Sequence, residues 1–548
     1  MFSFKSFGMV PVMALCLLPG ACMTVPAEPS PPPSTDMALR PYSVYGSHMV
    51  LQREKPIRIA GRAAPEREIT LVFAGRTVKV RPDSRGEWNA FFPAMKAGGP
   101  WTLNFTDGVS TITMTDILIG EVWLASGQSN MEWPVTQILR AEEEIADADY
   151  PQIRFFNGSS PVNSYKDKSR FGVPQDNIDG AFWRVCKPSN VYHFAAVSYF
   201  FARALHRELK VPVGVVTVAC SGSSIEPWIS LRAFDAFPGM KMSRMYPKDA
   251  TPENLFRSRI PGTPQHEAAR KEYVDSMAAW VADSRIKLEA REPLEKPPLP
   301  PKGLEPFGKD NYFPCVYYNT MIHPLRTFTF RGAIWYQGCS NIGDPGNVYK
   351  EKMKALAYDW RTLFNNPEFP IYYVQVAPFL HAKTKPFQLP WFWTVQQQFT
   401  DEDPHAKMAV TNDIGELNNI HPKNKQDVGK RLSLLALKYE YGKNIAADSP
   451  FYKSHTVRGS RLIVEFRNAE QLATRDGKVP DWFEIAGKDG VFHPAAASID
   501  GNKVILTSEK VDHPCFARFA WNQAAEPNLR NEGGLPTGAF QTGAPANP

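Results

Sequence analysis

Residues Gly120–Trp133 read Gly-Glu-Val-Trp-Leu-Ala-Ser-Gly-Gln-Ser-Asn-Met-Glu-Trp, an apolar run followed by a glycine-containing turn and Ser129. The run predicts a buried strand, because nearly continuous apolar residues are typical of a strand covered on both faces. In an open α/β sheet, ligands bind at the carboxyl ends of such strands. A serine there, with its backbone N–H free at a sharp turn, can serve both as nucleophile and as oxyanion donor. Ser129 is therefore a candidate nucleophile, and a buried turn serine without a chemical role is the alternative.

The region that follows predicts an α/β core. Apolar strand candidates at 213–219, 332–336, 371–376 and 408–411 alternate with helix-prone segments at 195–209, 349–363 and 425–441. This alternation predicts a parallel sheet with helices on both faces, and we place this core at 116–440. A polar segment at about 234–313 interrupts the pattern, and we expect a surface insertion there.

Regions of β character flank the predicted core. Between 42 and 115, short alternating runs are separated by Gly, Asp and Pro, which predicts a small β-sandwich. The alternation returns after 441, so we also expect a β region at 441–548.

The first 27 residues read as an export signal. Lys5 precedes an apolar run at 7–18, which is too short for a membrane-spanning helix. Cleavage at a lipoprotein site before Cys22 and ordinary cleavage after Ala27 both fit these residues. Both predict a location outside the cytoplasm, periplasmic or secreted. The lipoprotein alternative adds attachment to the outer membrane, only through a lipidated Cys22. The Pro-rich stretch within 28–41 predicts a disordered spacer.

The overall composition excludes several classes of protein. The 548 residues are 43% hydrophobic and 22% charged, which is not the composition of a disordered chain. The net charge of +6 includes no dense Lys/Arg block, so we expect no nucleic-acid partner. Five cysteines follow the signal, at 186, 220, 315, 339 and 515, without metal-ligand spacing. We therefore expect no metal, at least one free thiol, and room for one or two disulfides.

A serine nucleophile needs a base, and His421 is the candidate. It lies in a loop after the strand candidate at 408–411 and just before the helix candidate at 425–441, so it can point toward the same strand ends. A surface-loop histidine is the alternative. His323 is predicted to be structural. Cys339 is a rival nucleophile, but it has no cationic neighbour in sequence to lower its pKa.

Four motifs in order make the chain resemble a known family. They are the stretch Gly120–Trp133, Ser-Gly-Ser-Ser-Ile-Glu-Pro-Trp at 221–228, Arg-Gly-Ala-Ile-Trp-Tyr-Gln-Gly at 331–338, and Ile-His-Pro-Lys-Asn-Lys at 420–425. Together they resemble the sialate O-acetylesterase family of the SGNH hydrolases, and the resemblance covers nearly all of the chain after the signal. It implies an α/β fold with an SGNH-hydrolase three-layer core and accessory β regions at both ends.

The resemblance also implies a mechanism. Ser129 would attack an acetyl carbonyl, and His421 would act as general base and then as general acid. The backbone N–H groups of Ser129 and Gly222, with the side chain of Gln337, would hold the oxyanion. No metal or organic cofactor is implied, and the expected partner is an acetylated carbohydrate.

The chain departs from the family at the third member of the triad. SGNH enzymes commonly carry Asp three residues before the histidine, where this chain has Asn418, and many relatives carry Glu where this chain has Cys339. Both positions are therefore neutral. Asp413 and Glu416, upstream in the same loop, are candidate substitutes, and Asn418 could orient the imidazole through its amide.

Three functions are compatible with these residues. The first is an exported acetylesterase for plant cell-wall polysaccharide of the xylan or xyloglucan type, with O-acetylated sialic acids as the alternative substrate. The second is a carbohydrate-binding protein whose active site has decayed. The third is an esterase or lipase for apolar esters, which the lack of a long apolar lid disfavours.

Overall fold

The computed structural model describes residues 38–159, 172–242, 262–301, 304, 314–382 and 384–543. The predicted signal lies outside these residues, as does most of the predicted spacer. The last two spacer residues belong instead to strand β1 (Arg40–Pro41), which pairs with β3 (Ile57–Arg62). The first β-strand therefore begins before the expected boundary at residue 42.

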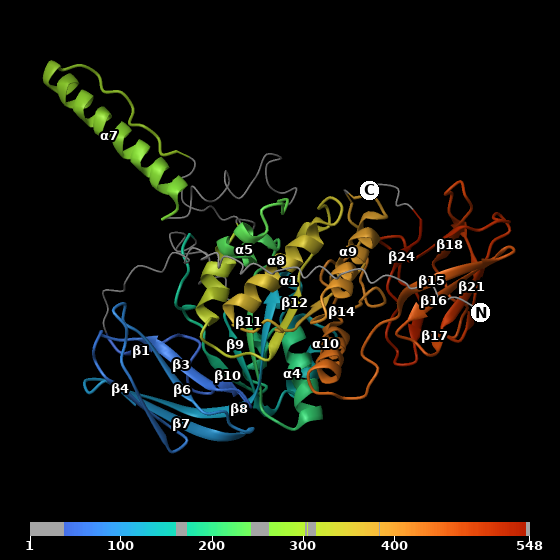
Figure 1. Cartoon of the computed structure of the whole chain (residues 1–548), viewed down its shortest axis with the longest axis horizontal. Helices are drawn as coiled ribbons and strands as arrows, with labels where there is room; N and C mark the ends of the chain where they lie inside the picture. The colour runs from blue at the N-terminus through green and yellow to red at the C-terminus, as the bar shows by residue number, and fades with distance from the viewer. Residues whose placement is uncertain are drawn as a thin grey trace, which may run out of the picture.

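One long strand, β8 (Thr111–Gly127), belongs to two parts of the molecule (Figure 1). Its first half pairs antiparallel with β7 (Gly98–Thr106), and its second half lies parallel between β11 (Val213–Ala219) and β12 (Gly332–Tyr336). The boundary predicted at 115/116 therefore falls inside a strand and not in a linker. The N-terminal β region and the core share one sheet.

The N-terminal β region has two facing sheets. One sheet contains β1, β3 and β6 (Glu87–Phe92); β4 (Ile69–Phe73), β5 (Arg76–Val80) and β7 form the other side. The ring pairs Trp88–Phe105 and Phe73–Phe92, with centroids 5.9 and 5.6 Å apart, join the two sides. This packing of inward-facing residues is the sandwich arrangement that the alternating sequence predicts.

The core sheet has the strand order β10-β9-β11-β8-β12-β13-β14, with β2 (Val50–Gln52) paired to β8. The remaining strands of this series are β9 (Tyr150–Asn157), β10 (Trp183–Cys186), β13 (Ile371–Val374) and β14 (Ala406–Ala409). The strands from β9 to β14 in this order run parallel, whereas the edge strand β10 is antiparallel to β9. The core sheet is thus mixed and not wholly parallel as predicted, because its edge strand β10 runs antiparallel to β9.

Successive residues of β8 pack on opposite faces of the sheet. Val122 and Leu124 belong to one hydrophobic cluster, whereas Trp123 and Ala125 belong to another. The first cluster includes residues of α5 (Leu231–Ala236), α8 (Val348–Leu363) and α9 (Gln388–Glu402), and the second includes α4 (Ala196–Leu209) and α10 (Lys425–Tyr439). The period of two in a strand therefore places helices on both faces, and burial of each large side chain contributes roughly 1.5–3 kcal/mol.

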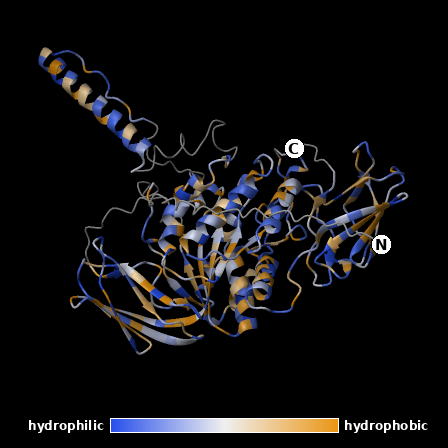
Figure 2. Cartoon of the chain, in the orientation of Figure 1, coloured by the Kyte–Doolittle hydropathy of each residue, from blue (hydrophilic) through white to orange (hydrophobic). Residues whose placement is uncertain are grey.

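The described part of the expected insertion contains one long helix, α7 (Pro264–Ala290), which projects away from the sheet (Figure 1). Thr263 caps it by accepting a hydrogen bond from the backbone N–H of His266. Hydrophilic residues are spread over its surface (Figure 2), and Ser284 is its one buried residue. This pattern fits a solvated helix outside the core.

The C-terminal β region consists of three small sheets, with strand orders β15-β16-β21-β20, β17-β23 and β19-β18-β22-β24. Their bounds are β15 (Phe451–Arg458), β16 (Arg461–Arg467), β17 (Leu472–Thr474), β18 (Phe483–Ala486), β19 (His493–Pro494), β20 (Ala496–Asp500), β21 (Lys503–Thr507), β22 (Phe516–Phe519), β23 (Leu529–Asn531) and β24 (Phe540–Gln541). Within the described residues, Cys186, Cys339 and Cys515 are free thiols. No described helix is long and apolar enough to cross a membrane.

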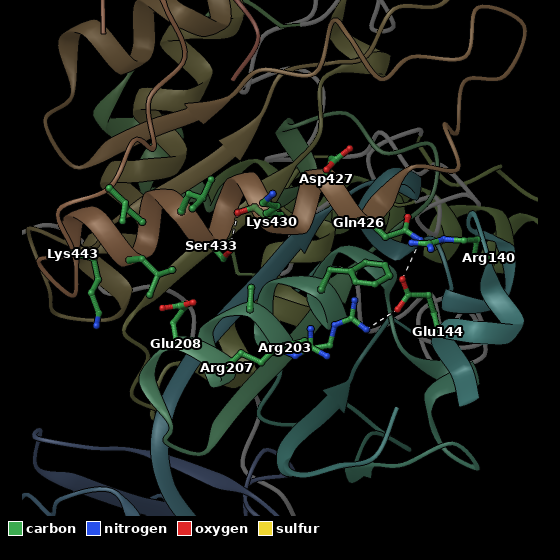
Figure 3. Close-up of a pocket in the computed structure, with 15 residues that line it drawn as sticks. Arg140, Glu144, Arg203, Arg207, Glu208, Gln426, Asp427, Lys430, Ser433 and Lys443 are labelled. Atoms are coloured by element: carbon green, nitrogen blue, oxygen red, sulfur yellow. Dashed lines mark hydrogen bonds and ion pairs between the residues drawn. The ribbon is translucent and has the colours of Figure 1, made fainter. Parts of the chain in front are cut away.

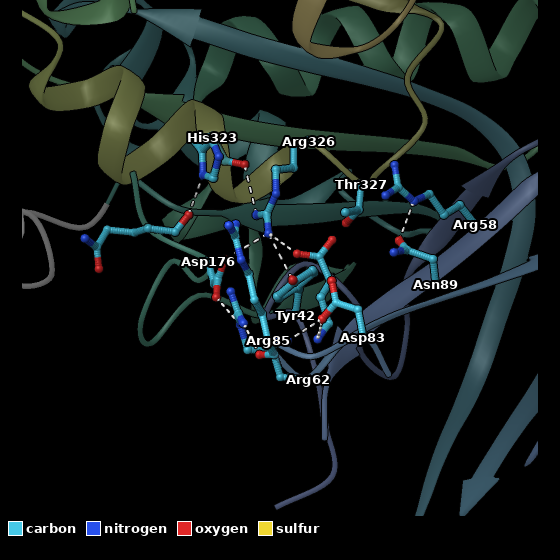
Figure 4. A network of polar contacts seen from close by, with 12 residues as sticks. Tyr42, Arg58, Arg62, Asp83, Arg85, Asn89, Asp176, His323, Arg326 and Thr327 are labelled. Carbon is cyan, nitrogen blue, oxygen red and sulfur yellow. Dashed lines mark hydrogen bonds and ion pairs between the residues drawn. The ribbon is translucent and has the colours of Figure 1, made fainter. Parts of the chain in front are cut away.

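A cluster of charged side chains, here called the junction, joins the N-terminal β region to the core (Figure 4). Its members are Tyr42, Arg62, Glu87, Asp176 and Arg326. Asp176 pairs with Arg62 at 2.5 Å and with Arg326 at 2.8 Å. Arg326 also pairs with Glu87 at 3.3 Å and donates to the hydroxyl of Tyr42 at 2.9 Å. Each carboxylate of the junction thus has a cationic partner, as buried charges require.

Candidate active site

Ser129 lies directly beyond the carboxyl end of β8, as the first residue of the short helix α1 (Ser129–Glu132). The turn before it needs glycine at position 127, because φ is +142° there and a Cβ would approach the carbonyl oxygen of Tyr336 to 2.3 Å. The backbone N–H of Gln128 donates to the same carbonyl at 3.0 Å. As a first helical residue, Ser129 keeps its own N–H free of intrahelical bonds.

The structure brings His421 to Ser129 across 292 positions of sequence. The Nε2 of His421 lies 2.8 Å from the Oγ of Ser129. The loop is held by its own side chains, since Asn419 accepts from the backbone N–H of His421 at 3.0 Å and donates to Glu416 at 3.0 Å. The ring of His421 also stacks on Trp133, with centroids 4.3 Å apart and planes 15° apart.

Burial and the nearby charge of Lys425 lower the pKa of His421 below its ordinary value of 6.5. The imidazole is therefore mostly neutral at pH 7, which is the form that can accept a proton from a serine hydroxyl. The contact with Ser129 and this protonation state are the two requirements for a serine–histidine pair.

None of the three predicted partners of the imidazole contacts it. Asn418 is exposed and makes no side-chain contact with His421 in the described residues. Asp413 binds both guanidinium N–H groups of Arg431 at 2.7 Å. Glu416 accepts from the backbone N–H of Lys423 at 2.5 Å as well as from Asn419, so it braces the loop. The expectation that one of them orients the ring is wrong: Asp413 and Glu416 are bonded to other groups, and the Asn418 side chain is exposed.

The second predicted oxyanion donor, Gly222, lies in the loop after β11 with φ +75°. No described residue accepts a hydrogen bond from its backbone N–H or from that of Ser129. The preceding residue, Ser221, donates its N–H (3.1 Å) and its hydroxyl (2.7 Å) to the Oε2 of Glu132. Because Glu132 ends the helix that Ser129 begins, this clamp ties the Gly222 turn to the nucleophile's helix.

The prediction for Gln337 needs correction. Its Nε2 donates to the carbonyl of Ser223 at 3.1 Å and to the Oδ1 of Asn341 at 2.8 Å, and its Oε1 accepts from Tyr349 at 2.9 Å. Both amide hydrogens are therefore used inside the protein, and neither is left for an oxyanion. Gln337 instead fixes the loop after β11 to the loop after β12.

A buried ion cluster lies behind these loops. Lys352, fully buried on α8, pairs with Glu226 at 2.7 Å and with Asp344 at 2.6 Å. Asn341 donates to Asp344 at 2.9 Å and accepts from the backbone N–H of Ile225 at 3.1 Å. The cluster therefore anchors the loop that carries Gly222 through Ile225 and Glu226.

Lys425 is a member of the site that the sequence did not suggest. Its Nζ donates to the Oδ1 of Asn130 at 2.5 Å, and Asn130 in turn donates to the carbonyl of Ile420 at 3.0 Å. Burial lowers the pKa of Lys425 to about 7. The bonds link the helix of Ser129 with the loop of His421. The only signal in sequence is the nearness of Lys425 to His421 at the start of α10.

The two other candidates singled out in the sequence have different surroundings. Burial raises the pKa of the Cys339 thiol to about 11, so it stays protonated and is a poor nucleophile. His323 is buried, its Nδ1 lies 2.8 Å from the carbonyl oxygen of Gln175, and burial lowers its pKa to about 4. His323 is therefore structural, as predicted.

A pocket of about 510 Å³ opens beside Ser129. Its lining includes Ser129, Glu132, Trp133, Arg184 and Tyr192. Tyr192 is 46% exposed. The guanidinium of Arg184 lies 4.0 Å from the ring centroid of Phe182 and pairs with no carboxylate in the described residues. Burial raises the pKa of Glu132, although the bonds from Ser221 act against the rise. The pocket thus offers one cation, one carboxylate and aromatic surface next to the nucleophile.

A second pocket, of about 480 Å³, lies along α4 and α10 (Figure 3). Charged side chains line it, including Arg203, which pairs with Glu144 at 2.6 Å. Its one serine, Ser433, donates to the carbonyl of Lys430 in its own helix, and the lining contains no histidine. This pocket therefore lacks the groups for ester hydrolysis.

Neither pocket provides a metal site. Across the part of the chain that the structure describes, no three His, Cys, Asp or Glu side chains are grouped so that they could hold a metal ion.

Comparisons with known proteins agree with this geometry. A family model described as carbohydrate esterase, sialic acid-specific acetylesterase, matches residues 309–438. The sialate O-acetylesterase of Rattus norvegicus is 27% identical over 492 residues, 81% of each chain. That of Homo sapiens is 26% identical over 495 residues, 83% of this chain and 81% of the human protein. A crystal structure of a carbohydrate acetylesterase from Xanthomonas citri is 30% identical, with a TM-score of 0.74; the match covers 92% of this chain and all of the other.

Proposed function

We propose that this chain, which belongs to the sialic acid-specific acetylesterase family of carbohydrate esterases and is an acetylesterase, uses Ser129 as nucleophile and His421 as base. The observation that carries the proposal is the 2.8 Å contact between the Oγ of Ser129 and the Nε2 of His421, at the carboxyl end of a core strand. This contact also argues against a decayed site, since a protein that only binds sugar has no need of it.

The reaction follows from the positions of these groups. Ser129 Oγ attacks the acetyl carbonyl carbon while its proton passes to Nε2 of His421. The N–H groups of Ser129 and Gly222 are the proposed donors to the oxyanion. The imidazolium then protonates the departing sugar oxygen, which leaves an acetyl–Ser129 ester. Water, deprotonated by His421, attacks this ester, and its breakdown releases acetate and restores the serine hydroxyl.

For the core architecture, the SGNH-hydrolase arrangement is the proposal. Two features support it: helices on both faces of the parallel strands, and the serine that directly follows β8. For location, the residues at 1–27 support export to the periplasm or beyond.

The proposed substrate is an acetylated plant cell-wall polysaccharide of the xylan or xyloglucan type. Long neutral glycans are bound through aromatic faces, and Tyr192 lines the pocket of Ser129 with nearly half of its surface exposed. Phe182 is 54% exposed beside Arg184 of the same pocket, which extends the aromatic surface.

O-acetylated sialic acid is the second candidate, and Arg184 favours it. Its guanidinium pairs with no carboxylate of the described residues and lies in the pocket that holds the nucleophile, which suits a sugar that carries a carboxylate. The curated relatives are named for sialate.

One experiment tests the mechanism and separates the substrates. Acetate release is measured from acetylated xylan, acetylated xyloglucan and an O-acetyl sialic acid with the wild type, Ser129→Ala and Arg184→Met. We expect Ser129→Ala to lose at least about 10³-fold on every substrate, and full activity would overturn the mechanism. If sialic acid is the substrate, Arg184→Met loses activity on it alone, whereas Arg140→Met, in the second pocket, is the matched control.

A further inference from the structure

Among the described residues, the imidazole of His421 has no partner of the kind that normally stabilises its charged form. In a serine–histidine mechanism the ring becomes positive in the transition state, and a carboxylate on Nδ1 usually stabilises that charge. Here no described side chain hydrogen-bonds to Nδ1. Burial and the charge of Lys425 both lower the pKa of His421, so both disfavour the imidazolium. Another group must favour the imidazolium if the pair is to act efficiently.

The face of the ring, in contrast, has a close partner. The indole of Trp133 lies nearly parallel to the imidazole, with the centroids 4.3 Å apart and the planes 15° apart. An aromatic face attracts a cation through its quadrupole, and tryptophan does so more strongly than tyrosine or phenylalanine. The attraction is selective, because the neutral imidazole of the ground state gains much less from it.

Two hydrogen bonds, one to the indole nitrogen and one to the backbone carbonyl of Trp133, hold the indole in this position. Its Nε1–H donates to the carbonyl oxygen of Gln137 at 3.0 Å, and the carbonyl oxygen of Trp133 accepts from the backbone N–H of Ala196 at 2.8 Å. Trp133 follows Glu132 directly, so the same short segment carries the nucleophile, the clamp on Ser221 and the stacked ring. The indole of Trp133 is therefore already in place when the positive charge develops on the imidazole.

We propose that Trp133 is a positioning residue that takes the place of the missing triad acid, by fixing the plane of His421 and stabilising its imidazolium through its π face. This inference rests on the proposed roles of Ser129 and His421. No carboxylate in the described part of the chain bonds to the edge of the imidazole, and the stabilisation comes from its face instead. The chain can thus carry Asn418 where an acid is common, because the orientation of the ring depends on Trp133.

Several charged groups lie in the site around the ring, and they must stay unchanged in the test. They are Lys425 at the start of α10, Glu416 in the histidine loop, Glu132 at the end of α1 and Arg184 on β10. The test variants therefore change Trp133 alone and keep an apolar side chain there, so that the imidazole stays covered. Trp133→Phe keeps a weaker π face, and Trp133→Leu keeps only the cover.

The experiment measures kcat/KM for acetate release against pH, and the pKa of His421 by NMR titration of labelled imidazole, in full-length protein. We expect kcat/KM to fall roughly two- to fivefold in Trp133→Phe and roughly five- to thirtyfold in Trp133→Leu, with the pKa of His421 falling in the same order. Trp101→Leu, which removes an exposed tryptophan from β7, is the matched control and should change neither quantity.

Two results would overturn the inference. One is a Trp133→Leu protein that keeps wild-type turnover. The other is a pKa of His421 that rises toward 6.5 in Trp133→Phe and Trp133→Leu, since that would show that the indole only excludes water. Failure of the serine–histidine mechanism would look different, because Ser129→Ala or His421→Ala would then retain activity. If Trp133→Leu does not fold, the order of pKa values in the wild type and Trp133→Phe still decides the question.

Discussion

The candidate active site around His421 and the junction around Arg326, beside which His323 lies, use charge in opposite ways. In the junction, Asp176 and Glu87 each pair with an arginine, and nearby His323 is buried with a carbonyl as its partner. In the site, His421 contacts a serine hydroxyl and an indole face, and no carboxylate of the described residues bonds to its ring.

The difference shows where the chain places its carboxylates. Asp413 and Glu416, which lie in the histidine loop, hold Arg431 and the loop backbone and do not hold the imidazole. A paired acid fixes structure, because breaking the pair leaves a buried charge without a partner. An unpaired, half-buried histidine can still gain and lose a proton. We therefore expect changes in the site to lower activity more than stability, and changes in the junction to lower stability more than activity.

The largest effect is expected for His421→Ala. Loss of the general base should lower kcat/KM for acetate release by about 10³- to 10⁴-fold, while the melting temperature stays close to that of the wild type. The matched variant is His323→Ala, which should keep most of the activity and lower the melting temperature, because it opens a buried cavity and removes the bond to Gln175. If His323→Ala proves the less active of the two, the assignment of roles is wrong.

The next largest effect concerns the junction. Arg326→Met should lower the free energy of unfolding by about 3–5 kcal/mol, because Glu87 loses its arginine and Asp176 loses one of two. Denaturant titration followed by tryptophan fluorescence measures this loss. The kcat of the folded enzyme should be unchanged, so a large loss of kcat at full folding would show that the junction also shapes the site.

A smaller effect is expected at the clamp on the Gly222 turn. Glu132→Ala removes the acceptor of both Ser221 bonds, so the proposed oxyanion donor is less well placed, and kcat should fall about ten- to hundredfold. Glu132→Gln keeps an acceptor oxygen and should lose less. Equal losses in the two variants would indicate that the negative charge matters and not the clamp.

The two regions also differ in their response to acid. Because the pKa of His421 is lowered, kcat/KM should fall on acidification with a midpoint below 6.5, where the base becomes protonated. Burial alone would raise the pKa of Asp176, but its bonds to Arg62 and the charge of Arg326 hold it below the ordinary value. The stability that Asp176 contributes is therefore complete above about pH 4 and is lost as pH falls further. Activity should fall first and stability second, which pH-dependent assays and melts would show.

The smallest effect is expected for Asn418→Ala. The side chain is exposed and does not contact His421 in the described structure, so kcat/KM should change less than about twofold. A tenfold loss, measured in the same acetate assay, would show that the amide orients the imidazole during the reaction.

Much of the core was predictable because its signals are local. The strands predicted at 213–219 and 332–336 coincide with β11 and β12, and α4 begins one residue after its predicted start. Ser129 could be found because an apolar strand followed by a glycine turn is a pattern in consecutive residues. The continuity of β8 was missed, since its two halves differ in pattern and only their partners show that they are one strand.

The sequence by itself determined where strands end, which serine follows one of them, and that a histidine loop precedes a helix, because these features depend on periodicity and turn residues nearby. Only the tertiary structure decided which side chains meet. It placed His421 against Ser129 and Trp133. It also bonded the Gln337 side chain to the loop after β11 and paired Asp413 with Arg431. Those contacts join segments far apart in the chain, and packing of the whole core sets their distances to a few tenths of an ångström.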